Sequence, residues 1–349
     1  MPKSFRSFAE RMLNPFLSFQ EMRYAVIIAA FSVIPSIAMF IVLQLYLSDA
    51  AVTMMCRGHH SLSSHDFAPL FNYYTIWVAH VLISVGVGVG ADRSAFRNAS
   101  EVKIKALKRF RIAIFLSLML IVFVADATHR NIALLSHERI FNVLSNDPAL
   151  AVMFHNDVRY LNRTIPMPTS FSFLPIVAVA AALWAMATVI LCCSRFLAAF
   201  QQSDGDSDTS SGDRVAAFSD AMEALRSHFL ALSLVLVTST LATIAFFRTP
   251  LGLLGSSERR DYQNISDAMG LVWGVTFSLT LIALCVYPFV VLRRRFDSLD
   301  RDAQDTKNAA LGRWIRKHRT LLQVPANLKL VLSILSPATV AIVSRLISI

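Results

Sequence analysis

His80 and Asp126 are ionisable residues that lie in two separate long apolar runs of the chain. Such a side chain is costly in hydrocarbon, so it is by default a candidate functional residue with a polar partner. If both runs cross a membrane, the two residues lie at similar depths near its outer side. We therefore predict a His80–Asp126 pair, which would either tune a proton-binding site or satisfy two buried polar groups between helices.

A second group of candidate residues lies between the first two apolar runs. It comprises Cys56, His59, His60, His65 and Asp66. Thiolate, imidazole and carboxylate groups are ligands for zinc or copper, and imidazole also titrates near neutral pH. The spacing matches no standard metal site, so the alternative is a solvated loop. These residues are candidate ligands for a transition metal, and no other cofactor is predicted.

The remaining motifs do not predict an enzyme. The segment GVGVGA at 86–91 formally matches the dinucleotide-binding pattern GxGxxA, but it closes an apolar run and does not follow a short strand. We interpret its glycines as sites of close helix packing. The chain contains no P-loop, no GxSxG and no HExxH motif, and Cys192, Cys193 and Cys285 form no disulfide framework.

The composition identifies the elements that must position these residues. The chain has 349 residues, of which 55% are hydrophobic and only 16% charged, against about 25% charged in soluble domains. Six apolar runs are long enough to cross about 30 Å of hydrocarbon as helices. They are 24–47, 73–90, 112–127, 174–194, 229–247 and 270–292, of which the third is the shortest. The predicted fold is an all-α, multi-pass membrane protein.

The distribution of cations predicts the orientation of these spans. Of the 33 Lys and Arg residues, 25 fall before the first run, after the second, after the fourth and after the sixth. The other connections hold 8. The positive-inside rule therefore places both termini in the cytoplasm and the protein in a cell (inner) membrane. Seven of the nine histidines then lie on the outer side or in the outer half of the spans.

Two terminal segments flank the predicted 24–292 membrane domain. Residues 1–23 are basic and aromatic, and we predict either a surface-lying helix or a frayed leader. Residues 328–349 are apolar but contain Pro337, so they could span the membrane, re-enter it or lie flat. Lys329, Ser333, Ser336 and Ser344 share a narrow polar stripe at helical spacing, which favours an interfacial or subunit-packing helix.

The basic tail at 293–327 predicts contact with anionic lipid headgroups. The candidate residues are Arg293, Arg294, Arg295, Arg316, Lys317 and Arg319. Each cation near an anionic membrane surface contributes about 1 kcal/mol. Nucleic acid is disfavoured as a partner, because no row of aromatic residues accompanies the cations.

Two functional hypotheses follow. The first is a non-enzymatic, oligomeric channel or membrane-permeabilising effector, in which hydroxyl-bearing spans line a hydrated path. The hydroxyl and amide residues concerned are Gln44, Ser84, Ser117, Thr188, Ser233, Thr238, Ser239, Thr240, Thr243, Thr276, Ser278 and Thr280. The alternative is a proton- or metal-responsive carrier or envelope sensor that uses the external histidines, with His80 and Asp126 as its intramembrane element.

Overall fold

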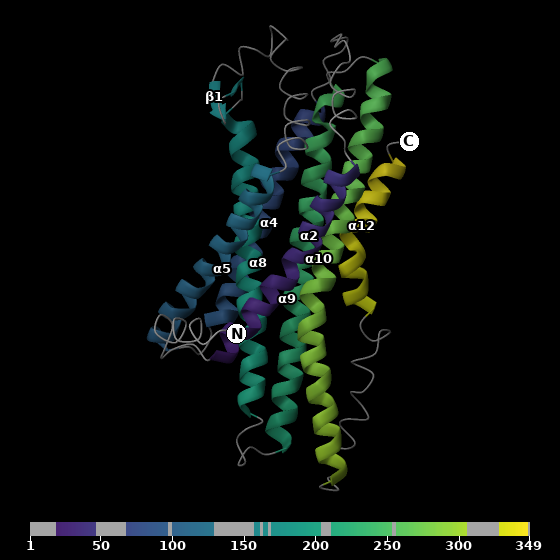
Figure 1. Cartoon of the computed structure of the whole chain (residues 1–349). Coiled ribbons are helices and arrows are strands. Elements are labelled where there is room, and N and C mark those ends of the chain that lie inside the picture. The colour runs from purple at the N-terminus through teal and green to yellow at the C-terminus, as the bar shows by residue number, and fades with distance from the viewer. Residues whose placement is uncertain are drawn as a thin grey trace.

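A computed structural model describes residues 19–46, 68–96, 100–128, 157–160, 163–166, 169–203, 211–252, 256–305 and 328–347. Each predicted run lies within a helix, except for Leu47 at the end of the first run, which is outside the described residues. The helices are α2 (Phe19–Tyr46), α4 (Ala68–Phe96), α5 (Glu101–Thr128), α8 (Thr169–Ser203), α9 (Ser211–Arg248), α10 (Ser256–Asp305) and α12 (Leu328–Ile347). They form an elongated bundle (Figure 1). A 3₁₀ turn, η1 (Thr249–Gly252), and an antiparallel pair, β1 (Asp157–Tyr160) and β2 (Arg163–Pro166), complete the described elements.

Within the described part of the chain, five segments are long and apolar enough to cross a membrane. They are Gln20–Ala38, Phe71–Phe96, Leu174–Ala198, Met222–Arg248 and Ser266–Ser298. The third predicted run is the second half of α5, whose first half carries Lys103, Lys105, Lys108, Arg109 and Arg111. The chain is a helical membrane protein, and its all-helical membrane domain confirms the predicted fold class.

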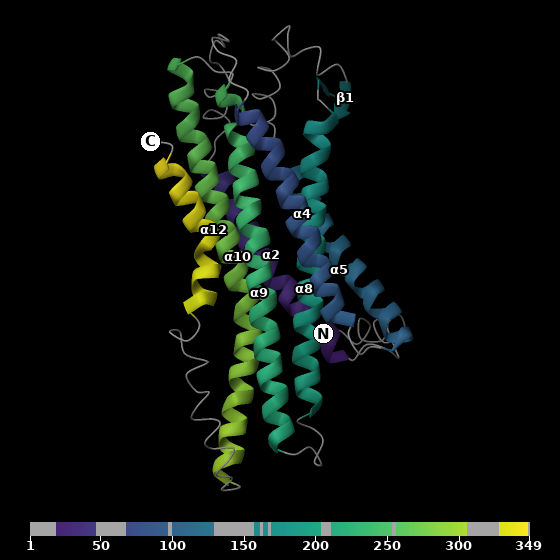
Figure 2. The ribbon, with the colours of Figure 1, turned by 180° about the vertical axis from the view of Figure 1, so that it is seen from behind.

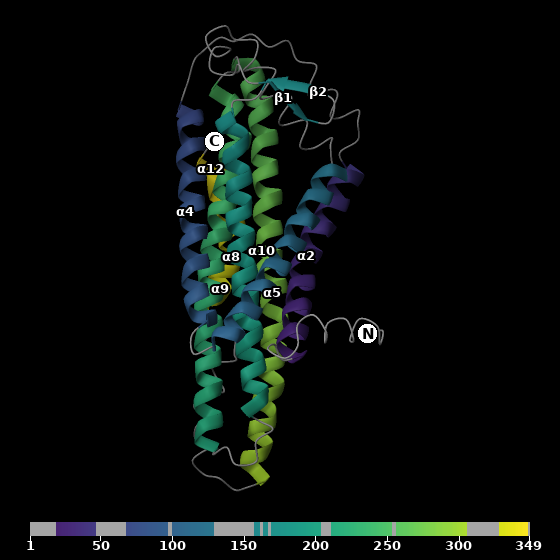
Figure 3. The same cartoon turned by 90° about the vertical axis from the view of Figure 1, so that its left-hand side faces the viewer.

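The helix α9 lies at the centre of the bundle and packs on α4, α8, α10 and α12. The helix α2 packs on α8 and α10, and α5 packs on α8. Both α2 and α5 tilt relative to the long axis of α8 and α10 (Figure 3). The two ends of the bundle are named by the helices that start or stop there. At the basic end α2 and α5 begin and α4 and α8 stop. At the far end α9 stops and α10 begins.

The side chains are distributed as expected in lipid. Large apolar residues point outward, including Leu82, Leu116, Ile176 and Leu346, whereas His80, Ser84, Thr188, Ser194 and Thr240 are buried. Because no hydrophobic force drives helices together in hydrocarbon, packing and interhelical polar contacts hold such a bundle. Pro35, Pro175, Pro288 and Pro337 all lie inside helices that continue past them.

The helix α12 packs lengthwise against α9 and α10, as the view from behind shows (Figure 2). Its buried or half-buried face includes Ser336, Pro337 and Ala341, and its exposed face carries Leu335 and Ile342. Ser336 Oγ lies 3.3 Å from Ser233 Oγ of α9, and the Ala338 amide donates to Ser278 Oγ of α10 at 3.1 Å. A polar face toward protein and an apolar face outward fit the membrane-inserting alternative for this segment.

Candidate functional site

The candidate site is built around His80, on the buried face of α4. The side chain is 2% exposed. Its Nδ1 lies 2.8 Å from Thr238 Oγ1, and its Nε2 lies 3.4 Å from Ser239 Oγ. Both hydroxyls belong to α9, which packs against α4. The imidazole therefore joins two membrane helices, with a hydroxyl at each ring nitrogen.

The backbone of α9 determines which way these hydroxyls donate. Thr238 Oγ1 lies 2.9 Å from Val235 O and 3.1 Å from Leu234 O, and Ser239 Oγ lies 2.9 Å from Val235 O. A hydroxyl has one hydrogen to donate and lone pairs to accept with. When these hydrogens are given to the carbonyls, both oxygens present lone pairs to the ring, so Nδ1 carries a hydrogen and donates to Thr238.

The second ring nitrogen has two compatible states. In a neutral ring, Ser239 turns its hydrogen toward Nε2 and releases Val235 O. In a protonated ring, Nε2 donates to Ser239 Oγ, whose hydrogen returns to Val235 O. One hydroxyl rotation therefore accommodates both states of His80 with the heavy atoms in place.

Two further polar atoms flank His80 along α4. Trp77 Nε1 and Ser84 Oγ are buried and have no hydrogen-bond partner within the described structure. Residues 77, 80 and 84 share one helix face, and the Trp77 ring packs edge-on to the His80 ring with centroids 6.1 Å apart. Buried polar groups normally pair with protein or water, so these atoms mark where water or a small polar ligand would bind.

Toward the basic end, the same side of α4 meets Trp184 of α8. A Cβ placed at Gly88 would lie 3.0 Å from Trp184 Cδ1, so glycine permits this close approach. Gly86 and Gly90 face open space. The packing interpretation of the GVGVGA segment thus applies to Gly88.

A buried ion pair lies one turn beyond. Arg111 of α5 donates to Asp92 Oδ1, and its guanidinium carbon lies 3.8 Å from the Trp184 ring centroid. Cys192 Sγ donates to Ala91 O at 3.1 Å on the neighbouring turn. An arginine over an indole face gains cation–π attraction in addition to its ion pair.

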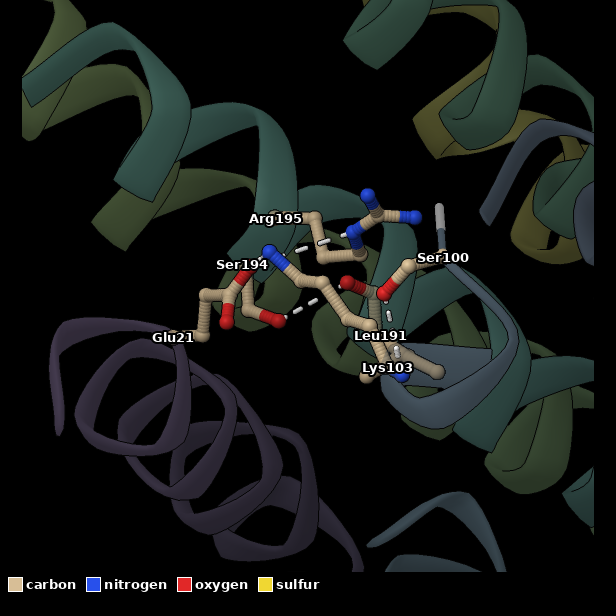
Figure 4. A network of polar contacts seen from close by, with 6 residues as sticks. All are labelled: Glu21, Ser100, Lys103, Leu191, Ser194 and Arg195. Carbon is tan, nitrogen blue, oxygen red and sulfur yellow. Dashed lines mark hydrogen bonds and ion pairs between the residues drawn. The ribbon is translucent and has the colours of Figure 1, made fainter. Parts of the chain in front are cut away.

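Glu21 forms a separate polar network that joins three helices at the basic end (Figure 4). Its Oε1 lies 3.2 Å from Lys103 Nζ of α5 and 3.8 Å from Arg195 Nε of α8. Ser100 Oγ accepts the Lys103 amide hydrogen at 3.4 Å and so caps α5. One buried carboxylate therefore holds α2, α5 and α8 together, which is a structural role.

Several predicted residues cannot be placed against this site. The Asp126 side chain and the whole cluster Cys56, His59, His60, His65 and Asp66 lie outside the described residues, as do Arg316, Lys317, Arg319 and the Arg295 side chain. Arg293 and Arg294 are exposed on α10. Among the described side chains, no three His, Cys, Asp or Glu residues gather closely enough to hold a metal ion.

The partners of His80 are a finding that sequence reasoning did not reach. In the sequence analysis, Thr238 and Ser239 are two of the many hydroxyl residues predicted to line a hydrated path. Most described members of that set donate to their own helix, such as Thr240 to Leu236 O at 2.9 Å and Thr276 to Val272 O at 2.8 Å. These bonds favour packing for them. The one signal available was the run Thr238–Thr240 at a depth similar to that of His80.

Comparison of the chain with protein-family models, with curated proteins and with solved structures found no match. The most unusual feature of the bundle is a buried imidazole with hydroxyls at both nitrogens and, on either side, polar atoms that have no partner among the described residues.

Proposed function

We propose that the protein is a non-enzymatic, proton-responsive membrane carrier whose proton site is His80. The observation that carries this proposal is the pair of α9 hydroxyls, which suit either protonation state of the ring. Imidazole is the side chain that changes charge near physiological pH. His80 has no counter-ion among the described side chains, and an intramembrane ionisable group of this kind is more often part of a functional path than of a scaffold.

The surroundings of His80 support a site that responds to protons. The helix α9 carries no ionisable residue between His228 and Arg248, and α8 carries none between Thr169 and Leu191. On α4 the nearest titratable groups are Tyr73 and Tyr74. A charge on His80 would therefore be stabilised by hydroxyls and by water near Trp77 Nε1 and Ser84 Oγ, and protonation would favour a more hydrated arrangement of α4 and α9.

The channel hypothesis is less well supported by the same atoms. A hydroxyl-lined pore needs hydroxyls that are available to water, whereas Ser117, Thr188, Thr243 and Thr280 each donate to a carbonyl of their own helix. A channel or permeabilising effector would pass ions or dyes through vesicles without a dependence on His80. That behaviour separates the two proposals.

The first prediction concerns the fluorescence of Trp77 in reconstituted protein. A protonated imidazole beside an indole quenches its emission, and the two rings are 6.1 Å apart. We expect emission to fall on acidification in the wild type, and His80→Gln or Trp77→Phe to abolish that pH-dependent change. His228→Gln is the matched control, because His228 lies on α9 with its Nδ1 against Ala224 O of its own helix. An identical titration in wild type and His80→Gln would overturn the proposal.

We also propose an orientation. By the positive-inside rule the basic end faces the cytoplasm. At the far end Arg248 Nη2 donates to Ser344 O at 3.0 Å, so the last turn of α12 lies at the end opposite to Glu21. With 20 residues, α12 is about 30 Å long, which matches the hydrocarbon thickness. We therefore propose that α12 crosses the membrane and that the C-terminus lies on the outer side, unlike the shared cytoplasmic location predicted for both termini.

The second prediction tests this orientation with cysteines added at the two ends of a cysteine-free variant. A membrane-impermeant maleimide should label a C-terminal cysteine in intact cells, and an N-terminal cysteine only after permeabilisation. Labelling of both ends only after permeabilisation would contradict a crossing α12 and restore the shared location.

A further inference from the structure

The face of α4 that carries His80 continues to the basic end. Ser84 lies one turn from His80, Gly88 one turn further, and Asp92 one turn beyond that. At about 1.5 Å per residue, these 12 residues cover about 18 Å. The helices that face this stretch of α4 are α8 and α9, and α5 reaches it through Arg111.

Trp184 of α8 lies against this face of α4 at the level of Gly88. A Cβ at position 88 would lie 3.0 Å from Trp184 Cδ1 and 3.4 Å from its Nε1, so the indole rests directly on the α4 backbone. The ring also packs at 77° against Phe115 of α5, with centroids 5.8 Å apart. The indole thus fills the space between α4, α5 and α8.

Arg111 lies over the face of the Trp184 ring. Its guanidinium stacks 3.8 Å from the Trp184 ring centroid and bonds to Asp92, and it is only 6% exposed. Its Nε is buried and has no partner among the described residues. A guanidinium with an unsatisfied donor, held by one carboxylate and one ring, has the means to bind a passing anion or water when the ring moves.

The charges in this part of the bundle are unbalanced. Asp92 comes from α4, Arg111 and Lys108 come from α5, and Arg195, which pairs with Glu21 of α2, comes from α8. Lys108 Nζ lies 6.0 Å from the Phe96 ring centroid, on the same side as Arg111. Three cations against these two carboxylates leave a net positive charge, which opposes the passage of metal cations.

We propose that Trp184 and the Asp92–Arg111 pair form a gate at the basic end of the His80 site, in which the indole sets the aperture and the charge of Arg111 opposes the passage of metal cations. This inference rests on the proposed proton site at His80. It assigns selectivity to a residue 31 positions along the chain from that histidine. In this structure the gate is closed, and it opens when the indole leaves the Gly88 backbone.

The experiment measures proton and potassium flux in vesicles that contain the full-length protein. Arg111→Met keeps the volume of the side chain and removes its charge, so we expect potassium flux to rise at least about tenfold over wild type, because a unit charge in a partly buried site acts strongly on a passing cation. Arg111→Lys should restore potassium exclusion. Lys105→Met is the matched control, because within the described structure Lys105 pairs only with Glu101 on the exposed face of α5, at 3.3 Å.

Gly88→Ala tests the aperture separately and leaves every charge in place. The added methyl would displace the indole by about a few tenths of an ångström from the α4 backbone, so proton flux should rise while potassium stays excluded. Elution as a single species on size exclusion confirms that each variant is folded. If Arg111→Met misfolds, Gly88→Ala is the deciding test of the gate. A proton flux in Gly88→Ala equal to that of wild type would overturn the gate.

The two proposals fail in different ways. Proton flux that His80→Gln leaves unchanged overturns the proton site. Proton flux that depends on His80, together with wild-type potassium exclusion in a folded Arg111→Met variant, overturns only the gate.

Discussion

Gly274→Val detaches α12 from the bundle. A Cβ at position 274 would lie 2.7 Å from Ala341 Cβ and 2.8 Å from Pro337 O. The second atom belongs to the backbone, so it cannot move without the whole helix. Overpacking of this kind costs about 1–3 kcal/mol. Displacement of α12 also breaks the contacts of Ser278 and Ser233 with this helix, at about 1 kcal/mol for each hydrogen bond.

The measurement is the thermal unfolding midpoint of purified protein, together with the rate at which protease removes the C-terminal segment. We expect a clear fall in the midpoint and faster cleavage. Gly86→Val is the matched control, because a Cβ at that α4 glycine meets nothing within 4 Å. If both valine variants unfold at the wild-type midpoint, the close approach of α10 and α12 is not an important contact.

The spans themselves could be predicted from sequence because the bilayer imposes a length. A span needs about 20 residues, and each predicted run lies inside one helix apart from Leu47, although the third run, 112–127, is shorter than this length. The ends could not be predicted, since hydropathy detects only the hydrocarbon zone. The run 270–292 became part of α10, Ser256–Asp305, which continues through polar residues on both sides. A helix already formed in lipid extends into water at little cost when its end residues favour it.

The buried histidine could be identified by its depth, but its neighbours could not. Depth along one run gives a height in the membrane and says nothing about which helix faces the residue. The faces are set by the packing of α4 against α8 and α9, which depends on contacts such as Gly88 with Trp184. The predicted His80–Asp126 pair stays a prediction. The observed contacts of His80 with Thr238 and Ser239 depend on how α4 and α9 are placed against each other, which a single sequence does not specify.

The C-terminal helix shows a second kind of ambiguity. A narrow polar stripe at helical spacing is expected both for a helix on a membrane surface and for one that packs on other helices inside the membrane. In this bundle Ser336 faces Ser233 of α9, and Leu335 and Ile342 are exposed. Hydropathy alone gives the same signal in both cases, so only the position of the neighbouring helices distinguishes them.

Arg248→Met weakens the far end of the bundle, where three helices meet. Arg248 Nη2 donates to Asp267 Oδ1 of α10 at 2.8 Å and to Ser344 O of α12 at 3.0 Å. Asp267 is 9% exposed, so loss of the cation leaves a buried carboxylate without this counter-charge. Removing one partner of a buried pair costs about 3 kcal/mol at the low end of the observed range, which suits a partly exposed arginine.

The thermal unfolding midpoint should therefore fall in Arg248→Met. It should fall by less in Asp267→Asn, because asparagine removes the charge and keeps the shape of the side chain. In the double variant the two losses should not add, since both act on one contact. Arg301→Met is the control, because among the described residues the exposed Arg301 bonds only to Asp297 O of its own helix, at 3.3 Å. Additive losses would show that Arg248 and Asp267 stabilise the bundle independently, and Arg248 would then act on α12 through its bond to the Ser344 carbonyl.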